Sequence, residues 1–352
     1  MTHAITRRRL LAAGLAGSAA WLAGCTLRMR VTDDDGRPLD DARHALAADT
    51  RAAGDGYAFV ESDWFDAARA RAVPVRLYLP LDAERRGALP LVLFSHGLGG
   101  SRRGYSYLGR HFARQGMASL HVQHVGSDRA IWRGNPFGLT ERLQEAAQDD
   151  EAVARVVDLR FALDRLLAQP PQAPLHAAVD RRRIVAAGHS YGANTALLAS
   201  GARVERDGRT IDLRDPRIAA AVLLSAPPFY GERALDRVLA PVTLPTLHVT
   251  ATGDDIRIPG YYSSAADRIA VFEATGSARK ALAVFAGGSH SIFTDRAGTG
   301  GIELNPRVKR ATQELAVAFL GSVFEGRHDP LRAWPERHQE ILARFERAPA
   351  LA

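Results

Sequence analysis

The stretch that most constrains the fold of this chain is residues 183–194, which read RIVAAGHSYGAN. It combines a short apolar strand pattern, a G-x-S-x-G turn and a run of small residues that can begin a helix. A turn of this kind between a strand and a helix strains the serine backbone and lifts the hydroxyl clear of the sheet. Glycines fit on both sides because a Cβ would crowd the turn. The stretch therefore predicts that Ser190 is a nucleophile, and the alternative is a structural turn without chemistry.

Strand and helix patterns alternate along most of the chain. Continuous apolar runs such as 89–94 are typical of strands that are buried on both faces. The expected strands are 75–79, 89–94, 118–122, 183–187, 218–224, 246–250 and 281–285, and the expected helices are 105–115, 139–168, 306–324 and 332–347. This alternation predicts an α/β fold with a mostly parallel sheet covered by helices on both faces. The 352 residues are enough for one large domain.

The chain divides into four predicted parts. Residues 1–24 are predicted to be an export signal, and the polar residues 25–72 a tether and N-terminal extension that adds a first strand or two. Residues 73–325 form the predicted α/β domain, and 326–352 a helical tail. Within the domain, an irregular insertion at 126–148 follows no strand or helix pattern at its start.

The N-terminal segment has the features of a bacterial export signal. A charged start at Thr6-Arg7-Arg8-Arg9 resembles a twin-arginine motif, and the apolar run after it is short for a bilayer span. The run ends in Leu-Ala-Gly-Cys, which resembles a lipobox, and Cys25 is the one cysteine of the chain. We therefore expect lipidation of Cys25 and attachment to a membrane at the periplasmic face of the cell envelope. A plain secretory signal, or an uncleaved anchor, is the alternative.

The charge pattern argues against a nucleic acid partner. The formal net charge is +7, and removal of Arg7, Arg8 and Arg9 with the leader would leave +4. Acidic residues are interspersed throughout, and no basic stripe with interleaved aromatics is present in the sequence. The expected partner is a small molecule, and the oligomeric state is left open.

A serine nucleophile needs a base, and the best candidate is His290. It lies in a Gly-rich loop after the last predicted strand, where it can reach the carboxyl edge of the sheet. His248 lies inside a strand and is expected to be a core residue. His121 and His124 form an H-x-x-H pair that could hold a metal, but no third ligand is evident. Two other histidines lie in the polar C-terminal tail, His328 and His338.

The base needs an orienting carboxylate, and two adjacent aspartates compete for that role. Asp254 and Asp255 both follow the strand at 246–250, after the serine and before the histidine, as expected for this arrangement. We favour Asp255 because it stands four residues before Pro259, a common D-x-x-x-P spacing. Asp254 is the alternative.

Two backbone N–H groups are needed for the oxyanion of the tetrahedral intermediate. The expected donors are Tyr191, directly after the serine, and Leu98, in the Gly-rich loop 96–100. A set of loop residues could line an acyl or alcohol pocket, and ordinary loop packing is the alternative for them: Trp132, Phe137, Pro228, Phe229 and Tyr230.

These motifs together resemble the α/β-hydrolase superfamily. The loop 94–100, FSHGLGG, and the sequence from His290 to Asp295 are similar to the platelet-activating-factor acetylhydrolase-like branch, often labelled dienelactone-hydrolase-like in bacteria. The resemblance covers about 73–325. It implies an eight-stranded sheet with the serine after the fifth strand, and hydrolysis of short or polar-headed esters without a metal or cofactor. Dienelactone hydrolases proper use cysteine where this chain has Ser190, so lactone specificity is not implied.

The sequence thus predicts an exported, lipid-anchored serine esterase that acts through Ser190, Asp255 and His290. A polyester or amide hydrolase with the same triad is a second hypothesis. A non-catalytic binding lipoprotein on the same scaffold is a third.

Overall fold

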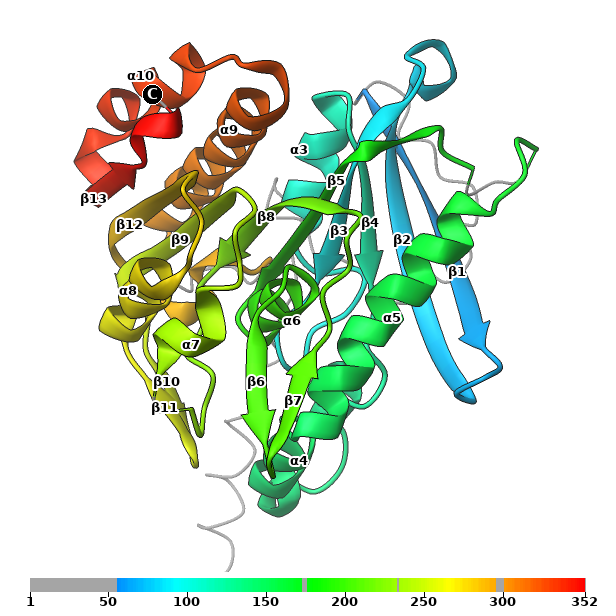
Figure 1. Ribbon diagram of the computed structural model, residues 1–352, viewed down its shortest axis with the longest axis vertical. Helices are drawn as coiled ribbons and strands as arrows, with labels where there is room; N and C mark the ends of the chain where they lie inside the picture. Colours follow the sequence, from blue (N-terminus) through cyan, green and yellow to red (C-terminus); the bar gives the residue numbers. More distant parts are fainter. Residues whose placement is uncertain (1–55, 173–175, 233, 296–300, 352) are drawn as a thin grey trace, which may run out of the picture.

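A computed structural model describes residues 56–172, 176–232, 234–295 and 301–351 (Figure 1). The predicted export signal and Cys25 lie outside the described residues. None of the helices in the described ranges is both long and apolar enough to cross a membrane.

The core of the molecule is a nine-stranded sheet with the order β1-β2-β4-β3-β5-β8-β9-β12-β13. The six strands from β4 to β12 pair in parallel, whereas β1, β2 and β13 join in antiparallel fashion at the two edges. The strands are β1 (Tyr57–Asp66), β2 (Arg71–Pro80), β3 (Leu89–Ser95), β4 (Ala118–Val122), β5 (Val179–His189), β8 (Ile218–Leu224), β9 (Thr246–Gly253), β12 (Lys280–Ser289) and β13 (Leu342–Arg347).

Helices cover both faces of this sheet (Figure 1). The α-helices of the described residues are α3 (Ser106–Arg114), α4 (Leu139–Glu145), α5 (Asp149–Leu167), α6 (Tyr191–Ala199), α7 (Leu235–Leu239), α8 (Ala265–Ala274), α9 (Leu304–Glu325) and α10 (Asp329–Arg337). The pleat of β3 divides the core, because Leu91 and Leu93 pack with α5 and α6 whereas Val92 and Phe94 pack with α3 and α9. Alternate residues of one strand therefore serve two apolar cores, which explains its continuous apolar sequence.

Two small two-stranded sheets lie apart from the main sheet. Two hairpins, β6 (Arg203–Arg206) with β7 (Arg209–Asp212) and β10 (Ile256–Ile258) with β11 (Tyr261–Ser263), lie at the same end of the molecule as α4 (Figure 1). Short 3-10 helices complete the described elements: Ala83–Arg85, Arg129–Trp132, Pro136–Gly138, His290–Phe293, Gln339–Ile341 and Pro349–Leu351.

The expected helix 139–168 is wrong in one respect, because it is two helices. Helix α4 ends at Glu145, and the backbone of Gln148, directly before α5, is extended with φ −69° and ψ 160°. Three acidic residues then occupy the first turn of α5, where carboxylates interact favourably with the positive end of the helix dipole. The period-3.6 pattern continues through this break, so it concealed the boundary.

The C-terminal tail is not wholly helical and belongs to the sheet. After α10, residues 342–347 form β13, which pairs antiparallel with β12 and makes the ninth strand. Phe345 packs on Trp334 with their ring centroids 5.4 Å apart. The reason is tertiary, since the edge of β12 offers unpaired backbone groups that a following segment can satisfy. At the other edge, β1 begins at Tyr57, so the domain also extends before residue 73.

Candidate active site

Ser190 lies at the sharp turn between β5, the fifth strand along the chain, and α6. Its backbone has φ 56° and ψ −124°, a conformation that is rare for a residue with a side chain. A Cβ on Gly188 would lie 2.2 Å from the carbonyl oxygen of Gly192, and one on Gly192 would lie 1.9 Å from that of Ser95. The turn therefore requires both glycines, as the sequence predicted.

His290 is brought to Ser190 by the 3-10 helix that follows β12. Its Nε2 lies 2.8 Å from Ser190 Oγ, and its Nδ1 lies 2.6 Å from Oδ1 of Asp254. Since Nδ1 faces a carboxylate, it carries the proton, and Nε2 is then free to accept the proton of the serine hydroxyl. This is the geometry of a nucleophile, a base and an orienting acid.

The acid beside His290 is Asp254, so the preference for Asp255 is wrong. Asp254 is fully buried at the end of β9, and its Oδ2 accepts a hydrogen bond of 2.6 Å from Thr250 Oγ1. Burial acts to raise the pKa of Asp254, but the hydrogen bond and charge of His290 and the charge of Arg268 outweigh it and hold the pKa below its usual range. Asp254 is therefore ionised at neutral pH.

Asp255 points away from this site. Its side chain is 41% exposed and pairs with Arg257 at 2.9 Å. The chain turns at Asp254, whose N–H bonds the carbonyl oxygen of Ala251, so the next residue faces solvent and leads into β10. Pro259 lies between β10 and β11, so the D-x-x-x-P spacing reflects this hairpin and not the position of the acid.

His189 is buried beside the segment that carries His290, and the sequence alone did not predict this contact. Nε2 of His189 lies 2.9 Å from the carbonyl oxygen of His290, and its Nδ1 lies 2.8 Å from the hydroxyl of Tyr105. Burial, followed by the charge of His290, lowers the pKa of His189 to about 3, so the ring is neutral. The proton must be on Nε2, because a carbonyl oxygen only accepts, and Tyr105 then donates to Nδ1.

A second unforeseen group is Arg155, which is fully buried beneath the turn. The guanidinium donates to Ser127 Oγ at 2.7 Å and to Ser95 Oγ at 3.0 Å, and it also donates to the carbonyl oxygen of His96. Its Nε reaches Thr195 Oγ1 of α6 at 2.9 Å. Burial lowers the pKa of Arg155 to about 10, which still leaves it charged at neutral pH. Only the tertiary structure reveals it, since an arginine at helical spacing normally faces solvent.

The Gly-rich loop after β3 lies beside Ser190, as expected. Leu98 lines the same pocket as Ser190 and Tyr191, and Tyr191 is the first residue of α6, so its N–H has no acceptor within the helix. Gly99 has φ +72°, and a Cβ there would lie 2.4 Å from the ring of Trp132. Trp132 Nε1 donates to the carbonyl oxygen of Gly99 at 2.8 Å and so holds the loop.

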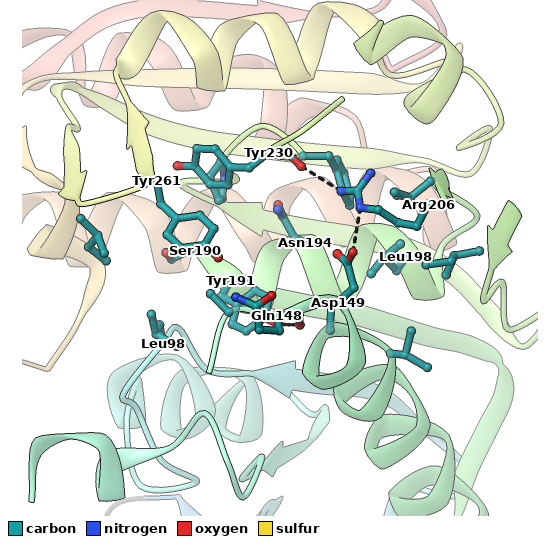
Figure 2. Close-up of a pocket in the computed structure, with 18 of the residues that line it drawn as sticks. Leu98, Gln148, Asp149, Ser190, Tyr191, Asn194, Leu198, Arg206, Tyr230 and Tyr261 are labelled. Atoms are coloured by element: carbon teal, nitrogen blue, oxygen red, sulfur yellow. Dashed lines mark hydrogen bonds and ion pairs between the residues drawn. The ribbon is translucent and has the colours of Figure 1, made fainter. Parts of the chain in front are cut away.

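A pocket of about 290 Å³ opens beside Ser190 (Figure 2). Its walls come from the loop after β3, from α5 and α6, and from the two hairpins at the end of the sheet. Most of the lining is apolar and includes Leu98, Val153, Leu198, Phe229 and Ile256. Pockets of this kind, with a few polar groups, are typical of small-molecule sites.

Only some of the loop residues that were expected to line a pocket do so. Phe229 and Tyr230 line the pocket, and Pro227 lines it in place of Pro228. Trp132 packs on the loop after β3, as described above. Phe137 is 94% exposed and makes no part of the lining.

The other histidines have structural roles. His121 stacks on Phe94 with ring centroids 4.8 Å apart, and His124 bonds Ser95 and Asp158, so the two rings serve different neighbours. No cluster of three or more metal-ligating side chains occurs in the described ranges. His248 is buried in β9 against Phe272, as its position in a strand predicted.

The mostly parallel sheet, with a serine at the turn after β5 and a histidine after β12, defines the α/β-hydrolase fold. Residues 66–136 match the family described as platelet-activating factor acetylhydrolase, isoform II. This segment contains the FSHGLGG loop, so the resemblance inferred from that loop is confirmed over this part of the chain.

A similar solved structure is a ferulic acid esterase from Streptomyces cinnamoneus. The two chains are 21% identical, and the match covers 84% of this chain and 99% of the esterase with a TM-score of 0.57. At this identity the likeness establishes the shared fold. No curated protein sequence matches the chain significantly.

Proposed function

We propose that the protein is a serine-dependent carboxylic ester hydrolase that acts on short or polar-headed esters. The observation that carries the proposal is the hydrogen-bonded series from Asp254 through His290 to Ser190, with distances of 2.6 and 2.8 Å. The similarity of residues 66–136 to an acetylhydrolase family and the fold shared with a ferulic acid esterase agree with it. The family and the solved structure are both named for hydrolysis, and the substrate class proposed for this chain comes from its resemblance to the acetylhydrolase-like branch.

The proposed catalytic cycle uses this hydrogen-bonded series together with two backbone N–H groups. His290 takes the proton of Ser190 as the oxygen attacks the ester carbonyl, and Asp254 stabilises the charged imidazole. The N–H groups of Leu98 and Tyr191 bind the oxyanion. His290 then protonates the leaving alcohol, and a water molecule repeats these steps on the acyl-enzyme to release the acid.

Hydrolysis of a p-nitrophenyl ester series, from acetyl to palmitoyl, tests the proposal. We expect turnover of the shorter members, and a loss of at least about 10³-fold in kcat for Ser190→Ala, since removal of the nucleophile leaves only background catalysis. Ser291→Ala, a change at a serine in the 3-10 helix of His290, is the matched control. Equal activity of wild type and Ser190→Ala would contradict the proposal.

We also propose that the protein is exported and held at a membrane by a lipid on Cys25. The support is the sequence alone, because residues 1–55 lie outside the described part of the chain. In a bacterial host, the wild type should label with radioactive palmitate and sediment with membranes, whereas Cys25→Ser should do neither. Membrane sedimentation of Cys25→Ser without label would favour an uncleaved anchor instead.

A further inference from the structure

Asn194 is a polar residue of the pocket whose side-chain oxygen has no hydrogen-bond partner. The residue is only 8% exposed, and its Oδ1 is buried without a partner among the described atoms. It lies one turn after Ser190 on α6, and Figure 2 shows it on the pocket wall between Ser190 and the ion pair of Arg206 with Asp149. Buried polar groups almost always have a hydrogen-bond partner, so the unpaired oxygen of this amide is an exception. A ligand in the pocket can supply the missing partner.

Most of the other polar side chains around the pocket are hydrogen-bonded within the protein. Arg206 donates to Asp149 at 2.9 Å and to the carbonyl oxygen of Tyr230 at 2.8 Å, and it also pairs with Glu232. The hydroxyl of Tyr230 lies 2.6 Å from Ser263 Oγ, and that of Tyr191 donates to the carbonyl oxygen of Gln148 at 3.4 Å. The amide of Asn194 is thus a buried polar group near Ser190 that is available to recognise a ligand. The hydroxyl of Tyr261, in the β10–β11 hairpin, also lines the pocket, but this residue is only partly buried.

The charges at the far end of the pocket disfavour an anion. One guanidinium, of Arg206, faces two carboxylates, of Asp149 and Glu232, so the local sum is one negative charge. A carboxylate on a ligand would be repelled by the surplus charge and would find no free arginine. The remaining walls are mostly apolar, so the part of the ligand that enters is uncharged and mainly hydrocarbon.

We propose that the pocket takes an uncharged, mainly apolar chain of the ester that carries a hydroxyl group, and that Asn194 selects for that hydroxyl. This inference rests on the proposed esterase function. One helical turn separates Asn194 from Ser190, about 6 Å along the axis, so the hydroxyl oxygen lies about six bonds from the ester carbonyl carbon. A hydroxyl both donates and accepts, and it therefore suits either orientation of the amide.

Matched esters with equal chain length test the selection. On the acyl side the pair is methyl 6-hydroxyhexanoate and methyl heptanoate, and on the alcohol side it is 4-hydroxybutyl acetate and pentyl acetate, with acid release followed in a pH-stat. For each pair, the selection is the kcat/KM of the hydroxyl ester divided by that of the methyl ester. We expect Asn194→Leu to lower this ratio about tenfold or more in one of the two pairs, because the hydrogen-bond partner that is lost is buried.

Leu198→Ala is the matched control, since Leu198 lines the same pocket one turn further along α6. This change enlarges the pocket without adding or removing a polar group, so kcat/KM should change by similar factors for both esters of a pair. The pair that responds to Asn194→Leu also identifies which side of the ester enters the pocket.

Binding to the inactive protein separates this inference from the proposed function. In the Ser190→Ala background, calorimetry with the four esters measures selection without turnover, and Asn194→Leu should again remove the preference for one hydroxyl member. If both ratios stay unchanged by Asn194→Leu, in kinetics and in binding, the role of Asn194 is wrong even where ester hydrolysis is established. If binding shows the effect but no ester is hydrolysed, the recognition stands and the esterase proposal fails.

Discussion

Two adjacent aspartates of the same chemistry have opposite environments, and this difference sets their roles. Asp254 is buried between His290, Thr250 and Arg268, whereas Asp255 is 41% exposed with Arg257 as its partner. A buried carboxylate has a fixed orientation and little competition from water, so it can hold an imidazole in one tautomer. An exposed carboxylate one residue away cannot do so.

At this scale we predict that Asp254→Asn lowers kcat for p-nitrophenyl acetate by about 10³- to 10⁴-fold, because the amide favours the wrong histidine tautomer. Asp255→Asn is the matched control and should change kcat by less than about threefold, since surface substitutions are close to neutral. Steady-state kinetics of the two variants measure this. A greater loss for Asp255→Asn than for Asp254→Asn would restore Asp255 as the acid.

At the scale of elements, Arg155 of α5 connects parts of the site that are distant in sequence. Its guanidinium bonds Ser95 and His96 at the end of β3 and Thr195 on α6, and it lies 4.4 Å from the ring centroid of Tyr191. The oxyanion donors proposed above lie in these two segments. The position of the loop relative to the serine therefore depends on a buried cation that belongs to neither.

We predict that Arg155→Met lowers the free energy of unfolding by about 3 kcal/mol, because several buried acceptors lose their donor. It should also lower kcat more than it raises KM, since the oxyanion donors act mainly in the transition state. Arg155→Lys should recover part of both effects. Denaturant unfolding and steady-state kinetics provide the measurements.

Arg165→Met is the control on the same helix, because Arg165 is exposed. It should leave both quantities within error of the wild type. A loss of stability in Arg155→Met with an unchanged kcat would show that Arg155 supports the fold without positioning the site.

At the scale of the whole molecule, buried neutral histidines make the fold sensitive to acid. Burial is the main cause of the low pKa of each of them: His96, His121, His124, His189 and His248. Below the unfolded pKa of about 6.5, the unfolded chain binds protons that the folded chain does not, so stability falls as the pH falls. Glu151 and Asp158 act in the opposite sense because burial raises their pKa, but they are two groups against five.

We therefore predict a steep fall in Tm between pH 7.5 and pH 5.5. Each such histidine costs about 1 kcal/mol of stability at pH 5.5 relative to neutral pH. Together they amount to a large share of the stability of a typical domain. Thermal unfolding followed by circular dichroism measures the effect. His248→Leu, away from the site, should reduce the slope, and a Tm that is flat over this range would contradict the prediction.

Local sequence alone was enough to predict the parallel sheet, the turn at Ser190 and the histidine loop. Each depends on short-range physics: continuous apolar runs for β3 and β8, two glycines that a tight turn requires, and a Gly-rich segment directly before His290. The choice of Asp254, the strand β13, the support from His189 and Arg155 and the unpartnered amide of Asn194 were decided by tertiary structure. Burial and pairing determine these features, and both depend on neighbours that are distant along the chain, so no local pattern carries them.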